Sequence, residues 1–203
     1  MSSAMIELET PHGPARAHLH EADSPVAALV LGHGAGGGVG APDLKAATEA
    51  ALDAGVTTIL VEQPYRVAGR KSAAPAPQLD AAWTAVVDQL PIEDLPLYVG
   101  GRSSGARVAC RTAEATGAAG VLCLAFPLHP PGKPEKTRLP ELEAVKVPVL
   151  IVQGESDPFG MPPEAANRRV VRLKGNHSLR SDVRGLRDAV TAFLRGGNDG
   201  DVD

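Results

Sequence analysis

Residues 101–105 (Gly-Arg-Ser-Ser-Gly) fit the Gly-x-Ser-x-Gly pattern, in which a sharp strand-to-helix turn exposes a serine hydroxyl. The two glycines have a steric reason, because a side chain two positions before or after the serine would collide with the neighbouring strand or helix. An apolar run over residues 97–99 leads into the turn, and helix-forming residues 106–115 lead out of it. This context predicts that Ser103 is a nucleophile at the carboxyl edge of a sheet.

A serine hydroxyl is a poor nucleophile at neutral pH, so Ser103 needs a base within hydrogen-bond reach and an anion that orients the base. Asp157 lies in a loop after an apolar run that ends at residue 152, and His177 follows the short apolar run 170–173. Both loops are expected at the same sheet edge as the serine. The chain order Ser, Asp, His is the one that accompanies a strand-turn-helix serine. We therefore predict a catalytic triad of Ser103, Asp157 and His177.

Two interpretations compete with this triad. Glu155 is a second acid in the same loop, but Asp157 lies deeper in it, and its shorter side chain is a stiffer partner for an imidazole. Asp157 and Pro158 can also form an ordinary turn, and His177 can be a surface residue of its loop.

A glycine-rich segment, residues 33–38 (His-Gly-Ala-Gly-Gly-Gly), follows the apolar run 26–32. It lacks the Gly-Lys-Ser/Thr ending of a P-loop and the Gly-x-Gly-x-x-Gly spacing of a dinucleotide site. It fits the His-Gly-x-Gly loop, in which a backbone N–H points freely at a substrate oxygen. We predict Ala35 and Ser104 as the two backbone donors of an oxyanion hole, with a flexible turn as the alternative interpretation of the loop.

The elements around these residues alternate between strands and helices. Residues 5–9 and 15–20 alternate apolar with polar side chains across a turn, which predicts an antiparallel hairpin. The other expected elements are strands over residues 26–32, 56–61, 120–125, 147–152 and 170–173, and helices over 43–54 (capped by Asp43), 78–90 and 183–193 (capped by Ser181). This order predicts the α/β class: a mostly parallel twisted sheet with helices on both faces. We expect one domain over residues 1–203, with 196–203 as a frayed tail.

Composition excludes several classes of protein. With 203 residues and 43% hydrophobic content, the chain is long enough to bury roughly 70% of its unfolded surface in one core. A net charge of −4 and a content of one Trp, two Tyr and three Phe argue against nucleic-acid binding. The longest apolar run, 118–126, is far short of the ~20 residues that span a bilayer. The first ten residues hold no basic cluster, so we expect no signal peptide and a cytoplasmic location.

Neither the cysteines nor the histidines predict a metal or an organic cofactor. Cys110 and Cys123 have no Cys-x-x-Cys spacing, which favours buried free thiols. His18 and His20 share one face of a strand, but an exposed strand face explains them better than a metal site, because no third ligand is near in sequence.

Several motifs together resemble one known group of proteins. They are 31–36 (Leu-Gly-His-Gly-Ala-Gly), 63–65 (Gln-Pro-Tyr) with 68–70 (Ala-Gly-Arg), 100–105, 126–135 (Phe-Pro-Leu-His-Pro-Pro-Gly-Lys-Pro-Glu) and 153–160. The chain resembles the small α/β-hydrolase subfamily that includes testis-expressed protein 30, a nonspecific-lethal-complex regulatory subunit and bacterial relatives. The resemblance runs from about residue 26 to 194, and the run around His129 is its most specific part.

The resemblance implies the α/β-hydrolase fold, a minimal core similar to dienelactone hydrolase, and a triad of Ser103, Asp157 and His177. Bacterial relatives often have methionine after the serine; Ser104 stands there in this chain, which leaves the backbone donor intact. Residues 126–140 are too short and too rich in proline for a helical cap, so we expect an open site.

These features predict a serine hydrolase that cleaves a small-molecule ester or thioester through an acyl-enzyme. A serine peptidase is a lesser alternative, because an amide leaving group needs better placed protonation. A noncatalytic interaction module is the alternative from another class, because fold does not imply function. The sequence does not indicate an oligomeric state.

Cationic and aromatic residues are expected in loops at the carboxyl edge. We predict that they bind an anionic part of the substrate, with solvation or pairing with nearby acids as the alternative. They are Tyr65, Arg66, Arg70, Arg102 and His129, with Lys133 nearby.

Overall fold

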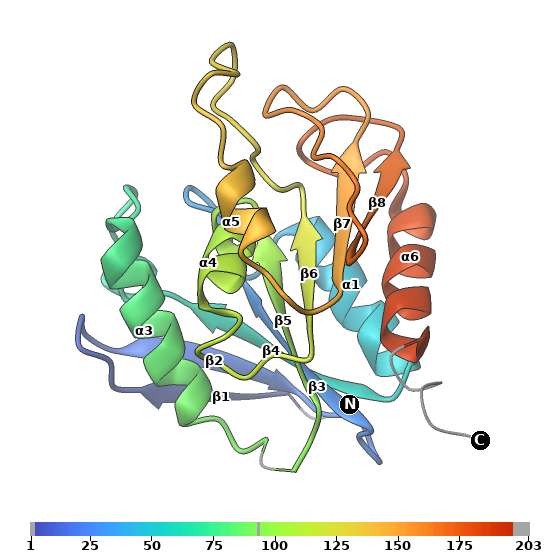
Figure 1. The fold of residues 1–203 in the computed structure, drawn as a ribbon. Coiled ribbons are helices and arrows are strands. Elements are labelled where there is room, and N and C mark those ends of the chain that lie inside the picture. The colour runs from blue at the N-terminus through green and yellow to red at the C-terminus, as the bar shows by residue number, and fades with distance from the viewer. Residues whose placement is uncertain (1–2, 93, 197–203) are drawn as a thin grey trace.

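The computed structural model describes residues 3–92 and 94–196, and one eight-stranded sheet runs through them. The order of the strands across the sheet is β1-β2-β4-β3-β5-β6-β7-β8. The strands are β1 (Ser3–Leu8), β2 (Ala15–His20), β3 (Ala27–Gly32), β4 (Val56–Glu62), β5 (Leu97–Arg102), β6 (Gly120–Leu124), β7 (Val149–Gly154) and β8 (Arg168–Leu173). From β4 to β8 neighbouring strands are parallel, and the β1–β2 hairpin joins β4 antiparallel (Figure 1). The predicted mostly parallel α/β sheet is confirmed.

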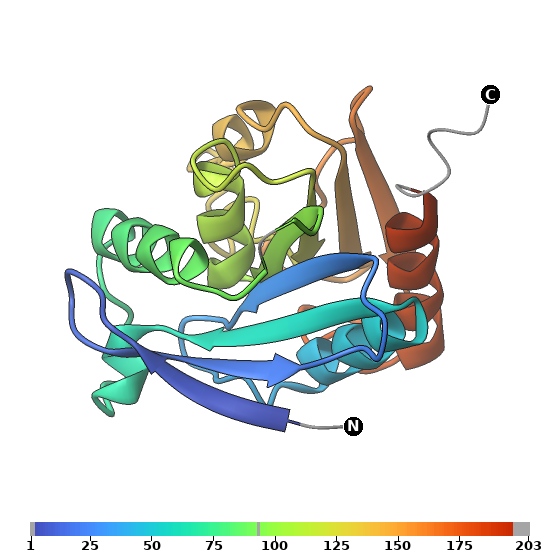
Figure 2. The same ribbon diagram turned by 90° about the horizontal axis from the view of Figure 1, so that it is seen from below.

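Helices cover both faces of the sheet (Figures 1 and 2). They are α1 (Pro42–Asp53), α2 (Pro64–Val67), α3 (Ala76–Asp88), α4 (Ser104–Thr112), α5 (Leu139–Glu143) and α6 (Val183–Gly196). Helices α1 and α6 bury their apolar sides, including Leu44 and Leu186, in one cluster, and α3, α4 and α5 bury theirs, including Trp83 and Leu142, in the other. All residues of β3 and β6 are buried, as expected for parallel strands covered on both faces.

The hairpin and the two cysteines lie as predicted. Along β2, buried residues alternate with half-buried ones, and His18 on the half-buried face contacts Glu62 at 2.8 Å. Cys110 on α4 and Cys123 on β6 are both buried free thiols, 3.6 Å apart between their sulfur atoms. Within residues 3–92 and 94–196, no helix is long and apolar enough to cross a membrane.

Both predicted helix caps are wrong. Helix α1 begins at Pro42 after Ala41, and the carboxylate of Asp43 turns inward to bind Arg102. At α6 the side chain of Asp182, not of Ser181, accepts the N–H of Gly185 at 2.8 Å. At α6 two adjacent residues can both cap a helix, so local pattern did not select between them, whereas α1 has no side-chain cap and its start is set by Pro42 in the first turn.

Several predicted boundaries also shift. Helix α3 starts at Ala76 rather than at 78, because prolines are well accommodated in a first helical turn. Helix α4 covers Ser104–Thr112 rather than 106–115, and strands β7 and β8 begin at Val149 and Arg168 rather than at 147 and 170. Helices α2 and α5 are four and five residues long, too short for a periodic signal, and were not predicted. The predicted tail lies outside the described residues, apart from Gly196 at the end of α6.

Strand β3 and the turn after β5 touch backbone to backbone. A Cβ atom added to Gly101 would lie 2.6 Å from the carbonyl oxygen of Gly32 and 2.7 Å from the backbone of Gly105. A Cβ atom at Gly105 would collide with the same carbonyl group and with the backbone of His33. No side chain fits between the end of β3 and the turn that carries Ser103.

Gly101→Ala is therefore expected to lower the free energy of unfolding by about 3 kcal/mol, because the backbone that it meets cannot move aside without separating β3 from β5. Gly36→Ala is the matched control: an added Cβ meets no atom within 4 Å there, and its expected change is below about 0.5 kcal/mol. Urea denaturation measures both. Equal stability of the two variants would contradict the close contact.

Candidate active site

Ser103 lies on a sharp turn between β5 and α4. Its backbone has φ 50° and ψ −108°, in the left-handed region that favours glycine, and it forms the N-cap of α4. The Ser103 N–H donates to the carbonyl of Leu124 at 2.9 Å, which ties the turn to the end of β6. A strained serine held by its neighbours is the expected geometry of an exposed nucleophile.

His177 contacts both Ser103 and Asp157. Its Nε2 atom is 3.0 Å from Ser103 Oγ, and its Nδ1 atom is 2.7 Å from Asp157 Oδ2. Asp157 is acceptor-only as a carboxylate, so the Nδ1 proton points at it, and Nε2 is left to accept the serine hydroxyl proton. The three residues predicted from the sequence therefore come together in the geometry of a triad. Glu155 is exposed, and its side chain takes no part in this chain of contacts.

The Asp157 carboxylate is fully buried and held by further donors. Its Oδ1 atom accepts the N–H of Phe159 at 2.8 Å, and its Oδ2 atom also accepts from the side-chain amide of Gln153 at 3.0 Å. Gln153 is itself fully buried at the end of β7. These contacts fix the direction in which the carboxylate meets the imidazole.

Phe159 and His129 pack around the acid loop. The Phe159 ring stacks on the His177 imidazole, with centroids 4.3 Å apart. The His129 N–H donates to the Phe159 carbonyl at 3.0 Å, and its ring lies over Gly160, where an added Cβ would be 2.6 Å from His129 Nε2. Gly160 has φ +93°, so glycine is required there for both space and conformation. His129 thus lies behind the acid loop rather than in front of the serine.

The loop after β3 is oriented by His33, which is almost fully buried. Its Nδ1–H donates to the carbonyl of Gly34 at 2.8 Å, and its Nε2 atom accepts the backbone N–H of Gln63 at 3.1 Å. Burial lowers the pKa of His33, in keeping with this neutral tautomer. In a planar trans peptide the N–H points opposite to the carbonyl, so fixing the Gly34 carbonyl also fixes the Ala35 N–H on the opposite side.

A second contact holds the same loop from its other side. The Tyr65 hydroxyl donates to the carbonyl of Ala35 at 2.9 Å, and the ring lies edge-on to His33 with centroids 5.7 Å apart. Tyr65 is buried. Its hydroxyl therefore contacts the glycine-rich loop, and its location differs from the predicted place in a substrate-binding rim.

Arg102 is half-buried and its guanidinium is held by contacts within the protein. Its Nη1 atom donates to Asp43 Oδ2 and to the backbone carbonyl of His177, both at 2.8 Å. The Asp43 side chain is only 1% exposed, and this burial raises its pKa, while Arg102 acts in the opposite direction. Arg102 thus ties α1 to the loop of His177. Sequence pattern alone held no signal for this pairing across 59 positions.

An open pocket of about 710 Å³ adjoins Ser103 and His177. It is lined by the glycine-rich loop, the start of α1, Arg102, Phe159 and Arg180. Of the five predicted substrate-binding residues only Arg102 is among the lining residues. Tyr65, Arg66, Arg70 and His129 are not. Arg180 was missed, although its position three residues after His177 was a usable signal.

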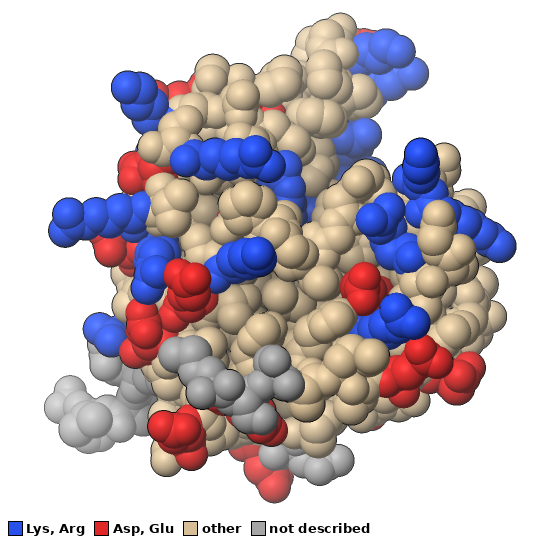
Figure 3. Space-filling view, turned by 180° about the vertical axis from the view of Figure 1, so that it is seen from behind, with Lys and Arg blue, Asp and Glu red and all other residues tan. Residues whose placement is uncertain are grey.

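The rim of this edge is basic. Viewed from the side opposite to Figure 1, most Lys and Arg side chains gather in the upper half of the molecule, at the level of the carboxyl edge, and most Asp and Glu side chains lie below them (Figure 3). Within the described residues, no group of three His, Cys, Asp or Glu side chains is placed to hold a metal ion.

The sequence also matches a family model. A model described as an alpha/beta hydrolase domain matches residues 25–185. The chain belongs to the α/β-hydrolase family. Among curated proteins, none matches it. The family match covers the strand-turn-helix of Ser103 and both loops that hold Asp157 and His177.

Solved α/β-hydrolase structures share the fold. A serine hydrolase without a lid from Xanthomonas campestris superposes with a TM-score of 0.77 at 20% identity, over 97% of this chain and 95% of that one. Est1E from Butyrivibrio proteoclasticus gives 0.78 at 18% identity, over 97% and 99%. A dienelactone hydrolase from Anabaena variabilis gives 0.71 at 15% identity, over 97% and 95%. At these identities the likeness is one of fold.

Replacing Arg102 should show how much the buried Asp43 carboxylate destabilises the folded state when it has no partner. Arg102→Met is expected to lower the free energy of unfolding at pH 7 by about 3 kcal/mol, because it leaves that charge without a partner. Arg102→Met with Asp43→Asn should recover most of the loss. Urea denaturation measures both.

The pH dependence of the free energy of unfolding distinguishes an unpaired Asp43 charge from a loss of side-chain packing. Without Arg102, the main influence that opposes burial at Asp43 is lost and the pKa of Asp43 rises further, so the folded state binds a proton more readily than the unfolded chain. Stability of Arg102→Met relative to wild type should therefore increase as pH falls from 7 toward 5, and the double variant should show no such gain. A single variant whose deficit is independent of pH would contradict this account.

Proposed function

We propose that the protein is a serine hydrolase that cleaves a small ester or thioester through an acyl-enzyme on Ser103. The observation that carries the proposal is the unbroken chain of contacts from Ser103 Oγ through His177 to the buried Asp157 carboxylate. His177 takes the serine proton while Oγ bonds to the substrate carbonyl carbon. The same proton then goes to the departing alcohol or thiol, and water clears the acyl group by the reverse sequence.

The developing oxyanion would be bound by the backbone N–H groups of Ala35 and Ser104. Ser104 is the first residue of α4, so its N–H has no partner inside the helix. The Ala35 N–H is held in direction by His33 through the Gly34 carbonyl. We assign Tyr65 and His33 as positioning residues of this hole, and His129 as a positioning residue of the acid loop.

The open pocket supports a small substrate with an anionic part. Arg180 lines the pocket and forms no ion pair among the described residues, whereas Arg102, which also lines it, is paired with Asp43. Arg66 and Arg70 would act only from farther along the rim. One solved structure of Est1E is described with ferulic acid bound, and a small carboxylic acid of this kind is the acyl product that the proposed ester hydrolysis would release. The narrower resemblance to the subfamily of testis-expressed protein 30, the single-domain organisation and the cytoplasmic location stay predictions.

Labelling with a fluorophosphonate probe tests the proposal without knowledge of the substrate. Ser103 should be phosphonylated while the other serines stay unmodified, and Ser103→Ala should abolish the adduct. His177→Ala should suppress it nearly as far, because the triad acts as a unit. Asp157→Asn should slow labelling by on the order of 10⁴-fold, as in the serine-protease template.

Glu155→Gln is the matched control for Asp157→Asn, since it removes a carboxylate from the same loop without touching His177. It should label at the wild-type rate. Mass spectrometry of the intact protein and its peptides locates the adduct. A folded wild-type protein that stays unlabelled at pH 8 would overturn the proposal and favour a noncatalytic interaction module.

Tyr65→Phe tests the positioning of the oxyanion loop. Loss of the hydroxyl frees the Ala35 carbonyl, so kcat for a p-nitrophenyl ester should fall about tenfold with KM nearly unchanged. Binding of a boronic acid, which mimics the tetrahedral intermediate, should weaken by the same factor. Tyr98→Phe is the control because Tyr98 of β5 packs against Phe193 of α6, and it should leave both values unchanged. Equal effects of the two changes would count against the assignment.

A further inference from the structure

The aromatic ring of Phe159 lies against the face of the His177 imidazole. The two ring centroids are 4.3 Å apart and the angle between the ring planes is 29°, so the rings are stacked. This separation is below the range of about 4.5–7 Å that aromatic pairs prefer. Phe159 is half-buried and also lines the pocket beside Ser103. The proposed reaction uses only the two nitrogen atoms of the imidazole, so it leaves this contact with the ring face without a role.

The acid loop holds the phenyl ring in place. The backbone N–H of Phe159 donates to Asp157 Oδ1 at 2.8 Å, and the Phe159 carbonyl accepts the N–H of His129 at 3.0 Å. Gly160, with φ +93°, turns the chain directly afterwards. Asp157 and Phe159 are two positions apart, and both reach His177: the carboxylate meets Nδ1, and the ring meets the imidazole face. One short segment therefore supplies two different contacts to the same base.

The charge of the imidazole changes during the proposed reaction. When His177 takes the serine proton, the neutral imidazole becomes an imidazolium cation, and it is neutral again once the proton has passed to the leaving group. The face of a phenyl ring is the negative part of its quadrupole, so it attracts a cation within about 6 Å of its centroid. The contact is therefore stronger in the transition state than in the resting enzyme, and only interactions of that kind raise kcat.

Charges of both signs adjoin the imidazole. The Asp157 carboxylate favours the imidazolium, but two further N–H donors already share its negative charge. Arg102 donates to the His177 carbonyl and is itself paired with an acid. Arg180 follows on the same loop, lines the pocket and forms no ion pair among the described residues, so it opposes a second positive charge nearby. The face of a phenyl ring favours the imidazolium without adding an anion that Arg180 could bind instead.

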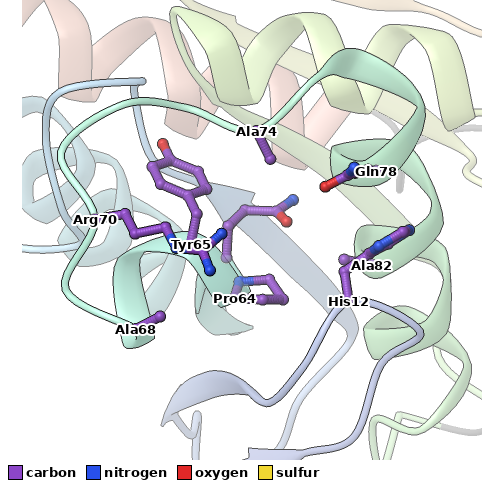
Figure 4. Close-up of a pocket in the computed structure, with 9 residues that line it drawn as sticks. His12, Pro64, Tyr65, Ala68, Arg70, Ala74, Gln78 and Ala82 are labelled. Atoms are coloured by element: carbon purple, nitrogen blue, oxygen red, sulfur yellow. The ribbon is translucent and has the colours of Figure 1, made fainter.

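Two other basic side chains, Arg70 and His12, belong to a different pocket. This second, smaller pocket has a volume of about 70 Å³ and lies beside α2. Tyr65 and Arg70 lie on one side of it, and His12, Gln78 and Ala82 lie on the other (Figure 4). None of its lining residues lines the pocket of Ser103. They are His12, Gln63, Pro64, Tyr65, Ala68, Arg70, Ala74, Gln78 and Ala82.

We propose that Phe159 is a positioning residue of the triad whose ring face stabilises the imidazolium form of His177 in the transition state. The assignment rests on the proposed hydrolase function and adds a residue that acts through His177 rather than on the substrate. The competing explanation is that the ring only packs against the imidazole and keeps it in place. The two explanations differ in whether the electron density of the ring affects the rate.

Fluorination of Phe159 changes the charge of the ring face and keeps the size of the ring nearly constant. Each fluorine withdraws electron density, so 4-fluoro-, 3,5-difluoro- and 3,4,5-trifluorophenylalanine in place of Phe159 form a graded series. Phosphonylation of Ser103 by an alkyl fluorophosphonate should slow stepwise, by about fivefold for three fluorines. The half-saturating concentration of the probe should not change. This probe has no aromatic group that could itself stack on the phenyl ring.

Phe193 on α6 is the matched control, because it packs edge-on against Tyr98 and does not line the pocket of Ser103. The same fluorinated residues in place of Phe193 should leave the rate unchanged. Phe159→Leu removes the ring face, and it should lower kcat for an aliphatic thioester about fivefold with KM nearly unchanged. Phe159→Tyr keeps the ring face and should restore most of the rate.

A labelling rate that does not fall with the number of fluorines would overturn the assignment, and a loss confined to Phe159→Leu would show that the ring acts by packing alone. Equal losses from fluorination of Phe159 and of Phe193 would also overturn it. A wild-type protein that stays unlabelled at Ser103 rejects the hydrolase function itself, and this result precedes any fluorinated variant. Failure of the hydrolase proposal is therefore distinct from failure of the role of Phe159.

Discussion

The close approach of two backbones, at the end of β3 and in the turn after β5, determines the geometry of the whole site. The carbonyl of Gly32 lies where any side chain at Gly101 or Gly105 would collide with it. This contact sets the separation between the two segments that follow, which are the glycine-rich loop with Ala35 and the turn with Ser103. An oxyanion hole needs donors placed to within fractions of an ångström, and a contact between backbones varies less than one between flexible side chains.

The other half of the site depends on polar contacts that reach across the fold. Arg102 is the last residue of β5, yet it binds Asp43 of α1 and the carbonyl of His177, so one guanidinium joins three separate segments. Gln153 and His129 hold the acid loop in the same way from β7 and from the segment after β6. The catalytic geometry is thus supported by buried hydrogen bonds rather than by a cap domain, which leaves the pocket open.

Residues whose role depends on local geometry were predictable from the sequence. The glycines around Ser103 and the His-Gly-x-Gly loop each express a steric requirement that is satisfied within a few positions. The triad members are far apart in the chain, but each follows its own apolar strand, and that local signal placed all three at one sheet edge. Roles that arise from long-range pairing were not predictable. Arg102 and Tyr65 were placed correctly at the carboxyl edge, but their polar groups bind Asp43 and Ala35, which no local pattern connects to them. Short helices such as α2 lack the two turns over which periodicity becomes detectable.

The difference between local and long-range requirements also applies to residues 63–70. Their motif could be recognised from the sequence, but the contacts that require these residues could be seen only in the structure. Gln63 acts through its backbone N–H on His33 and through its side chain on the wall of a different pocket, and Tyr65 shares both surroundings. A residue constrained from two sides tolerates few replacements, which makes its motif specific without indicating which constraint matters. Because the two constraints use different atoms, Tyr65→Phe separates the hydroxyl contact with Ala35 from the ring that lines the small pocket. Such single-atom changes are therefore the appropriate probes for a segment that supports the candidate active site and also lines a second pocket.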